Sequence, residues 1–450
     1  MEWVDPPTAD AHIRDAAAAL RSWRRKLRTA PAHAREQDPL ASRRLISTRQ
    51  AFQRAAELPD GLPGKRDLVR WVAFLTIERA THEDLCSAEA SRVDPVHPVD
   101  QLDGRIWSIR ELVAQAVFAR EPSRRANAAA TLARVADDAS SSALWWLGRR
   151  HEAARQLGLR SLSELEAPFT EDVEPAQAAR TLIEKTESVA AEVMGGRDHW
   201  QEALHWGAAT DAHDGWPSKL TPRWLREVFC AEAWTQGLAL DFGPMPTARS
   251  GASYARAFAR YGATLHRAVS ARPGTPFVMA ERPYDAGAAS YGALFASLLC
   301  APPFLRRKLG LGAVSISRHM PRMVRALVTG CRREAAKAVL ACTGNPEAAR
   351  QAHALIVTRA FRTPIPVELA GVVPRYDPRS TALVAGILQG GVLREQLVEQ
   401  FDEDWFDNPR CQEFLRAVDV TQPVVLDARV VERGAQAWRR FLEGGLDRAT

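Results

Sequence analysis

The chain has 450 residues, of which 46% are hydrophobic and 25% are charged, and its formal net charge is +6 at pH 7. This composition supplies enough apolar side chains for a sizeable core and predicts a soluble globular protein. It contains no run of about 18 apolar residues, which excludes a helix that spans a membrane.

Apolar residues recur with a spacing near 3.6 through most of the chain, and alternating strand patterns are nearly absent. Ala, Leu, Arg and Glu fill the long windows between Pro and Gly breaks, and Ala and Leu in particular favour helices. The pattern predicts an all-α fold. The expected helices cover residues 9–29, 41–57, 65–79, 103–119, 123–137, 141–157, 174–194, 221–238, 252–270, 286–300, 313–341, 346–361, 379–400 and 424–443.

Two short segments favour extended structure. Residues 275–279 follow Pro273 and Gly274, and Ile and Val alternate in residues 364–369. They predict at most a small β-sheet. We interpret the chain as one continuous helical fold, with an N-terminal region over residues 1–140 and a second region over residues 141–450.

The most informative segment covers residues 252–299. Residues 258–266 read FARYGATLH, and residues 285–295 read DAGAASYGALF. The first resembles the motif H-E-F-G-H-x-L-H of the thimet oligopeptidase and oligoendopeptidase F family of zinc metallopeptidases, and the second resembles that family's segment D-F-V-E-x-P-S-x-x-x-E. Residues 154–165 and 401–410 resemble further family segments. The resemblance implies a two-lobed helical architecture around a deep channel.

In this resemblance every zinc-binding position has changed. The two His ligands correspond to Ala259 and Ala263, the Glu ligand corresponds to Ala288, and the general base corresponds to Arg260. A catalytic zinc needs three side-chain donors and an open position for water, and alanine has no donor. Arg260 is a permanent cation that cannot accept a proton and repels a dication. The resemblance therefore implies a pseudopeptidase without a zinc cofactor.

A second interpretation explains the same residues without any relationship to this peptidase family. Tyr254, Phe258, Tyr261 and Leu265 recur at helical spacing, as they would in any amphipathic helix that buries one face.

If the resemblance holds, Arg260 faces the former channel. A shielded cation costs free energy unless a carboxylate pairs with it, so we expect Asp285 or Glu281 beside Arg260. An unpaired Arg260 would instead bind an anionic ligand such as a peptide carboxylate. The candidate ligand-binding residues of the channel are Arg260, His266, Asp285 and Tyr376, the only tyrosine between residues 364 and 378.

A different metal site is the main alternative. Glu202 and His205, three residues apart, can face one site as in metal-binding helix bundles, with His199 and His213 nearby. His199 and His205, however, lie about 120° apart on a helical wheel. The tryptophans around them favour aromatic packing instead.

Two groups of cations stand out: the predicted helix over residues 9–29 carries Arg21, Arg24, Arg25, Lys26 and Arg28, and a second group after Phe304 consists of Arg306, Arg307 and Lys308. No nucleic-acid motif accompanies them, so we interpret both as solvated helix faces and expect no nucleic-acid or membrane partner. The six cysteines lack C-x-x-C spacing and the N-terminus lacks a secretory signal pattern, which predicts a cytoplasmic location.

The expected function is binding of a peptide or protein partner without catalysis. The alternatives are an enzyme of unrelated chemistry with a metal at His199, Glu202 and His205, and a helical scaffold with a basic nucleic-acid-binding face.

Overall fold

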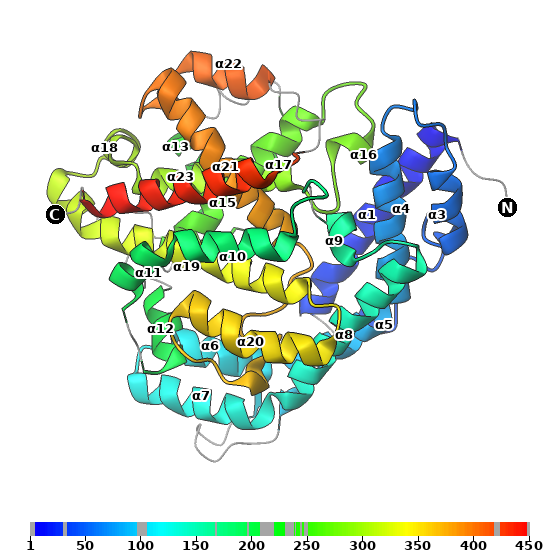
Figure 1. The fold of residues 1–450 in the computed structure, drawn as a ribbon, viewed down its shortest axis with the longest axis horizontal. Helices are drawn as coiled ribbons and strands as arrows, with labels where there is room; N and C mark the ends of the chain where they lie inside the picture. The colour runs from blue at the N-terminus through cyan, green and yellow to red at the C-terminus, as the bar shows by residue number, and fades with distance from the viewer. Residues whose placement is uncertain are drawn as a thin grey trace.

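The computed structural model describes residues 5–29, 34–96, 106–166, 169–195, 198–207, 220–229, 238, 240–243, 245–246, 251–417 and 424–447. Within these ranges the chain is helical almost throughout, which confirms the all-α prediction (Figure 1).

The helices are α1 (Pro6–Thr29), α3 (Arg49–Ala56), α4 (Lys65–Ala80), α5 (His82–Val93), α6 (Ile109–Phe118), α7 (Pro122–Val135), α8 (Asp137–Gln156), α9 (Leu162–Glu166), α10 (Pro175–Lys185), α11 (Glu187–Met194), α12 (Trp200–Gly207), α13 (Pro222–Val228), α15 (Gly251–Ser270), α16 (Phe277–Ala280), α17 (Ala286–Ser297), α18 (Pro302–Leu309), α19 (Ala313–Ala341), α20 (Pro346–Phe361), α21 (Ser380–Phe401), α22 (Pro409–Ala417) and α23 (Ala428–Asp447). The 3₁₀ turns are η1 (Arg44–Ile46), η2 (Leu298–Cys300), η3 (Val367–Leu369) and η4 (Trp405–Asp407), and the strands are β1 (Pro95–Val96) and β2 (Trp107–Ser108).

The helices α19 and α20 begin and end at the predicted residues, whereas α5, α12, α18 and α22 lie outside the expected ranges. Local capping explains why two helices, α6 and α3, begin later in the sequence than expected. Ser108 and Glu111 form a capping box, so the helix expected from residue 103 begins at Ile109. The Thr48 side chain accepts a hydrogen bond from the backbone N–H of Ala51, and α3 begins after it.

The small sheet is not where the sequence pattern placed it. Residues 277–280 form the short helix α16 and residues 367–369 form η3, so both strand predictions were wrong. The strand pair that exists joins β1 to β2 in an antiparallel register. Alternation over a few residues is a weak signal, and here it falls in turns next to Pro276 and Pro366.

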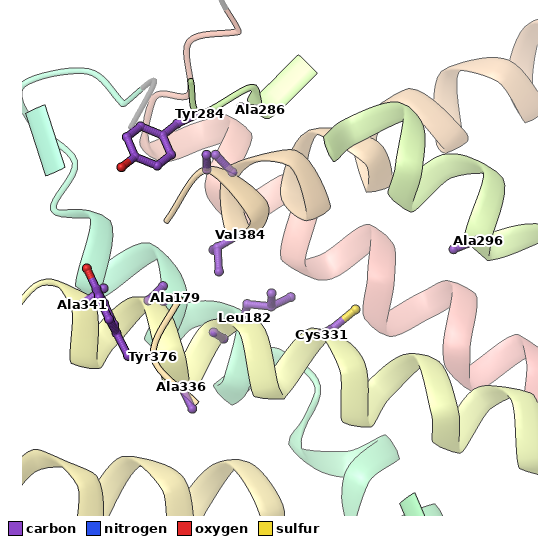
Figure 2. Packing of buried hydrophobic residues seen from close by; sticks show 14 of the residues in the cluster. Ala179, Leu182, Tyr284, Ala286, Ala296, Cys331, Ala336, Ala341, Tyr376 and Val384 are labelled. Atoms are coloured by element: carbon purple, nitrogen blue, oxygen red, sulfur yellow. The ribbon is translucent and has the colours of Figure 1, made fainter. Parts of the chain in front are cut away.

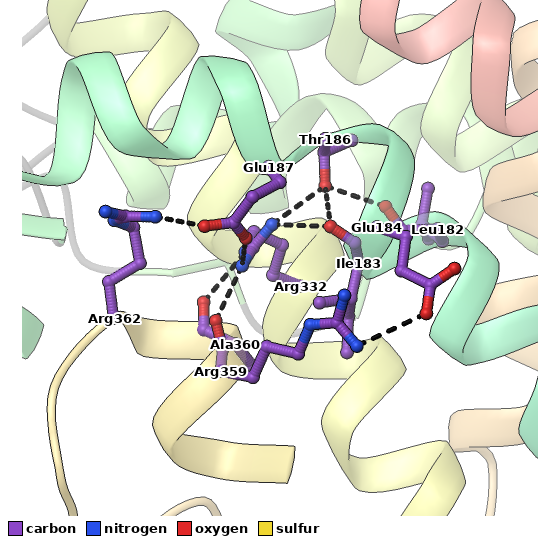
Figure 3. A network of polar contacts seen from close by, with 9 residues as sticks. All are labelled: Leu182, Ile183, Glu184, Thr186, Glu187, Arg332, Arg359, Ala360 and Arg362. Atoms are coloured by element: carbon purple, nitrogen blue, oxygen red, sulfur yellow. Dashed lines mark hydrogen bonds and ion pairs between the residues drawn. The ribbon is translucent and has the colours of Figure 1, made fainter. Parts of the chain in front are cut away.

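The single helix expected over residues 174–194 is broken at Thr186 into α10 and α11. The buried side chain of Arg332 holds the break (Figure 3). Its guanidinium donates to the carbonyl of Ile183 at 2.7 Å and to the carboxylate of Glu187 at 2.6 Å. It also donates to the carbonyl of Ala360 at 2.9 Å. One side chain from α19 therefore satisfies backbone acceptors at the ends of two other helices.

Figure 1 shows α1, α3, α4 and α5 as one group and α10, α15, α17, α19, α21 and α23 as another. The second group forms much of the core. Ala179 and Leu182 of α10 lie near Ala336 of α19 and Val384 of α21 (Figure 2), and all four side chains are buried.

The tightest packing is between α17 and its two neighbours, α15 and α21. A Cβ on Gly262 of α15 would lie 2.2 Å from the carbonyl oxygen of Tyr291, and one on Gly386 of α21 would lie 2.3 Å from the Cβ of Ala289. Backbones can approach so closely only because both positions are glycine.

None of the described helices alone is long and apolar enough to cross a membrane; α17 with η2 and α18 meets that criterion only as a pair bent by 81°.

Replacement Gly386→Ala should lower the free energy of unfolding by about 1–3 kcal/mol, because the added methyl overlaps the α17 backbone. Urea unfolding of the purified variant measures it. The matched control is Gly330→Ala in α19, where a Cβ meets nothing within 4 Å. That change should be neutral, or stabilising by up to about 1 kcal/mol through helix propensity. Equal losses in both variants would contradict close packing at Gly386.

Candidate functional site

The three alanines that the sequence resemblance aligns with zinc ligands lie on the neighbouring helices α15 and α17. A Cβ on Gly292 would lie 2.9 Å from the carbonyl oxygen of Ala259, and one on Gly287 would lie 2.5 Å from Nε2 of His266. These contacts make the two helices antiparallel, with the Ala259 end of α15 beside Gly292 and its His266 end beside Gly287. The structure thus brings Ala259, Ala263 and Ala288 to one helix pair.

This helix pair offers methyl groups where a metal would need lone pairs. Ala288 is only 1% exposed, and Ala259 and Ala263 are partly buried. In the part of the chain that the structure describes, no group of three His, Cys, Asp or Glu side chains is arranged to hold a metal ion. The donor set required for a catalytic zinc is therefore not provided by the residues at these positions.

His266 and Asp285 form a buried pair beside these alanines. Nδ1 of His266 lies 3.7 Å from Oδ2 of Asp285, while Oδ1 of Asp285 accepts the backbone N–H of Ala288 at 2.8 Å. Asp285 is therefore the N-cap of α17. The His266 ring packs edge-on against Tyr291, with 5.0 Å between ring centroids. Burial lowers the pKa of His266 despite the opposing effect of Asp285, so the ring is neutral at pH 7.

Arg260 is not paired as expected. Glu281 binds Arg21 at 2.7 Å, and Asp285 caps α17 beside His266, so neither acid pairs with Arg260. Nη1 of Arg260 is shielded from solvent and has no hydrogen-bond partner among the described residues. Burial lowers the pKa of Arg260 from its ordinary value, but the group stays cationic at pH 7. The expectation of a partner acid was wrong, because both candidate acids serve other groups.

Tyr376 lines a different place in the fold. It borders a cavity of about 240 Å³ between α1, α5, α8, α19 and the segment before α21, and Arg260, His266 and Asp285 do not line this cavity. The Tyr376 ring packs edge-on against Trp146, with 5.2 Å between centroids. The structure therefore brings His266 and Asp285 together and places Tyr376 elsewhere, and no contact among the described residues joins Arg260 to these three.

A buried carboxylate that the sequence pattern did not reveal lies next to this cavity. Glu78 of α4 pairs with Arg24 of α1 and with Arg150 of α8, and Arg150 also donates to the hydroxyl of Tyr284 at 2.5 Å. Burial alone would raise the pKa of Glu78, but the two guanidinium groups outweigh it and the pKa lies below its ordinary value. These residues lie far apart in sequence, and no local motif joins them.

The basic patches are not simply solvated helix faces. Arg24 pairs with buried Glu78, Arg307 binds Asp404 at 2.6 Å, and Lys308 pairs with Asp407. For Arg24 and Lys308 the sequence interpretation was wrong, because acids from other segments hold these partly buried cations, whereas Arg307 remains a solvated cation with a surface ion pair.

The described residues do not assemble the alternative metal site either. Both carboxylate oxygens of Glu202 accept hydrogen bonds from Arg125, at 2.8 and 2.6 Å. Nδ1 of His205 lies 2.8 Å from the carbonyl of Val117. His199 is exposed just before α12, and His213 lies outside the described residues. Glu202 therefore serves as the ion-pair partner of Arg125 and not as a metal ligand in this structure.

Comparison with known proteins adds one likeness. Neither the protein-family models nor the curated proteins match this chain. Among solved structures, a carboxypeptidase of Pyrococcus furiosus in its apo-Mg form is similar, with a TM-score of 0.53 and 10% sequence identity over 98% of this chain and 99% of that one. At this identity the likeness shows the fold alone. It supports a peptidase-like helical fold without distinguishing one peptidase family from another.

The pKa of His266 gives a testable pH dependence. Its folded-state pKa lies below the ordinary value of 6.5, so the unfolded chain takes up the proton first as the pH falls. The free energy of unfolding should therefore decrease between pH 7 and pH 5. The variant His266→Gln should lose less stability over this interval than the unmodified protein, as measured by urea unfolding at both pH values. An NMR titration that gives His266 a pKa above 6.5 would contradict this and show that Asp285 dominates.

Proposed function

We propose that this protein is a non-catalytic member of the peptidase-like helical folds and binds a peptide or protein partner. The observation that carries the proposal is the residue at the general-base position. In the resemblance to the zinc peptidases, Arg260 of α15 aligns with the general base, and Ala259, Ala263 and Ala288 of α15 and α17 align with the three ligands. Zinc-dependent peptide hydrolysis needs a general base and three side-chain metal ligands at these positions. Arginine cannot act as the base, and alanine cannot bind the metal.

Arg260 is the proposed anchor for the partner. Its shielded Nη1 lacks a hydrogen-bond partner among the described residues, and its desolvation is not offset by an acid there. A carboxylate of a bound peptide would accept from this group in a charge-assisted hydrogen bond, which is among the stronger polar contacts. We propose that the peptide's C-terminal or side-chain carboxylate occupies this position.

A cytoplasmic location belongs to the same proposal. The described cysteines, Cys86, Cys300, Cys331, Cys342 and Cys411, are free thiols. Burial raises the pKa of Cys411 to about 12, which keeps it protonated and unreactive.

Peptide binding should depend on Arg260. The probe is a set of fluorescein-labelled octapeptides with free C-terminal carboxylates, compared with the same peptides amidated, in fluorescence anisotropy. Arg260→Gln should weaken binding of the free-carboxylate peptides about tenfold or more, because one charge-assisted hydrogen bond is lost. Arg260 makes no ion pair with a described acid, so the change leaves no described carboxylate unpaired.

The matched control is Arg267→Gln, an exposed cation on the same helix, which should leave binding unchanged. Absence of binding by every peptide would overturn the proposed function. Cleavage of the peptides by the unmodified protein, abolished by a chelator, would overturn the claim that it is non-catalytic.

Restoring the four changed positions should restore a metal site more readily than catalysis. The variant Ala259→His, Arg260→Glu, Ala263→His, Ala288→Glu should retain about one equivalent of zinc after dialysis, whereas the unmodified protein holds none there. Peptide hydrolysis should remain weak, because precise placement of further transition-state donors is also needed. Elemental analysis and a peptide cleavage assay measure the two outcomes. Failure of the variant to bind zinc would show that α15 and α17 do not present these positions to one point.

A further inference from the structure

The cavity of about 240 Å³ beside Tyr376 is strongly cationic. Five cations line it: Arg24 and Arg28 from α1, Lys337 from α19, and Arg375 and Arg379 from the segment that leads into α21. The two acids in its wall are Glu89 and Asp377. The sources of these cations are far apart in sequence, so only the folded chain creates the charged cavity.

The acids around the cavity do not balance its cations. Four carboxylates, those of Glu78, Glu89, Glu334 and Asp377, are shared among the paired cations around the cavity: Arg24, Arg92, Arg150, Arg333, Lys337, Arg375 and Arg379. Arg28 is a further cation that pairs with no described carboxylate; its Nε donates to the carbonyl of Arg24 at 3.2 Å. A cation excess therefore remains in the wall.

Desolvation adds to the cost of this excess. Burial lowers the pKa of Arg375 to about 10, and burial together with Arg110 and Arg28 lowers the pKa of Arg92 to about 10. Burial and then the neighbouring Arg379 and Arg24 lower the pKa of Arg28. All of these groups stay charged at pH 7. Arg28, Arg375 and Arg379 are exposed, so solvent screens part of the positive charge in the wall, and an anion would neutralise the remainder.

The wall of the cavity also has apolar members. Leu27, Leu85 and the Trp146 and Tyr376 rings contribute to it. Trp146 is fixed by its edge-on contact with Tyr376 and by the guanidinium of Arg150, which lies 5.5 Å from its ring centroid. A lining that combines cations with aromatic and aliphatic side chains suits a small organic ligand that carries oxyanion groups.

We propose that this cavity is a binding site for a small, multiply charged oxyanion, either a phosphate ester or a polycarboxylate. A single carboxylate would neutralise only part of the surplus in the lining, where five cations face two acids. Arginine supplies paired donors that match phosphate and carboxylate oxygens alike. The site is separate from the proposed peptide anchor Arg260 and does not depend on it.

The test uses isothermal titration calorimetry on the full chain at low salt, with pyrophosphate, citrate and acetate as probes. Pyrophosphate or citrate should bind at least about tenfold more tightly than acetate, since each carries several charges. Tighter binding of pyrophosphate identifies the phosphate class, and tighter binding of citrate identifies the polycarboxylate class. Added sodium chloride should weaken the binding.

Arg28→Gln should reduce the affinity for the tighter probe about tenfold, and because Arg28 has no described acidic partner, the variant leaves no described carboxylate unpaired. Arg379→Gln is the second variant, since Asp377 keeps Lys337 as a partner. The matched control is Arg49→Gln, an exposed arginine on α3 with the same change of charge, which should leave the affinity unchanged.

Two results would overturn the proposal: binding of pyrophosphate and citrate no tighter than acetate, or equal losses of affinity in the Arg28, Arg379 and Arg49 variants. Arg260→Gln, measured with the same probes, should bind them like the unmodified protein. A variant that loses only peptide binding and one that loses only oxyanion binding would separate the two sites, so either proposal can fail without the other.

Discussion

Close contact between helix backbones holds the centre of the molecule, because α17 lies between α15 and α21 with small residues at the crossings. Gly262 and Gly292 allow α15 and α17 to approach, and Gly386 and Gly390 do the same for α21. The same packing brings α15, which carries Ala259 and Ala263, against α17, which carries Ala288, and these three side chains carry no metal donor.

Acids that bind groups from other segments join the distant parts of the chain. Glu78 connects α1, α4 and α8, and Glu187 receives Arg332 from α19. Asp10 of α1 also accepts the backbone N–H groups of Phe277 and Val278, at 3.1 and 2.8 Å, and so caps α16. Glu78, the buried member of the three, would be costly to bury alone, and it is satisfied by guanidinium groups that arrive only on folding. The first helix is thereby fixed to the second half of the chain.

The peptidase-like fold does not by itself determine the chemistry of the candidate site. The likeness to the carboxypeptidase of Pyrococcus furiosus spans 98% of this chain, yet at 10% identity it shows only a shared arrangement of helices. A fold of this kind can keep its helices while the residues at the reacting position change. Here Ala259, Ala263 and Ala288 lie on α15 and α17, and neither of these helices lines the cationic cavity.

The amino-acid sequence by itself determined the all-α fold and the limits of its long helices, since these follow from local periodicity and from Pro and Gly breaks; α19 and α20 are the clearest cases. The resemblance of residues 258–266 and 285–295 to a zinc-peptidase motif was also read from the sequence alone, because a motif consists of consecutive residues. Only the tertiary structure decided the break at Thr186, the partners of Arg24 and Glu78, the lack of a described acid beside Arg260, and the cavity beside Tyr376. These features depend on side chains brought together from distant segments, and the free energy of such contacts leaves no local pattern in the sequence.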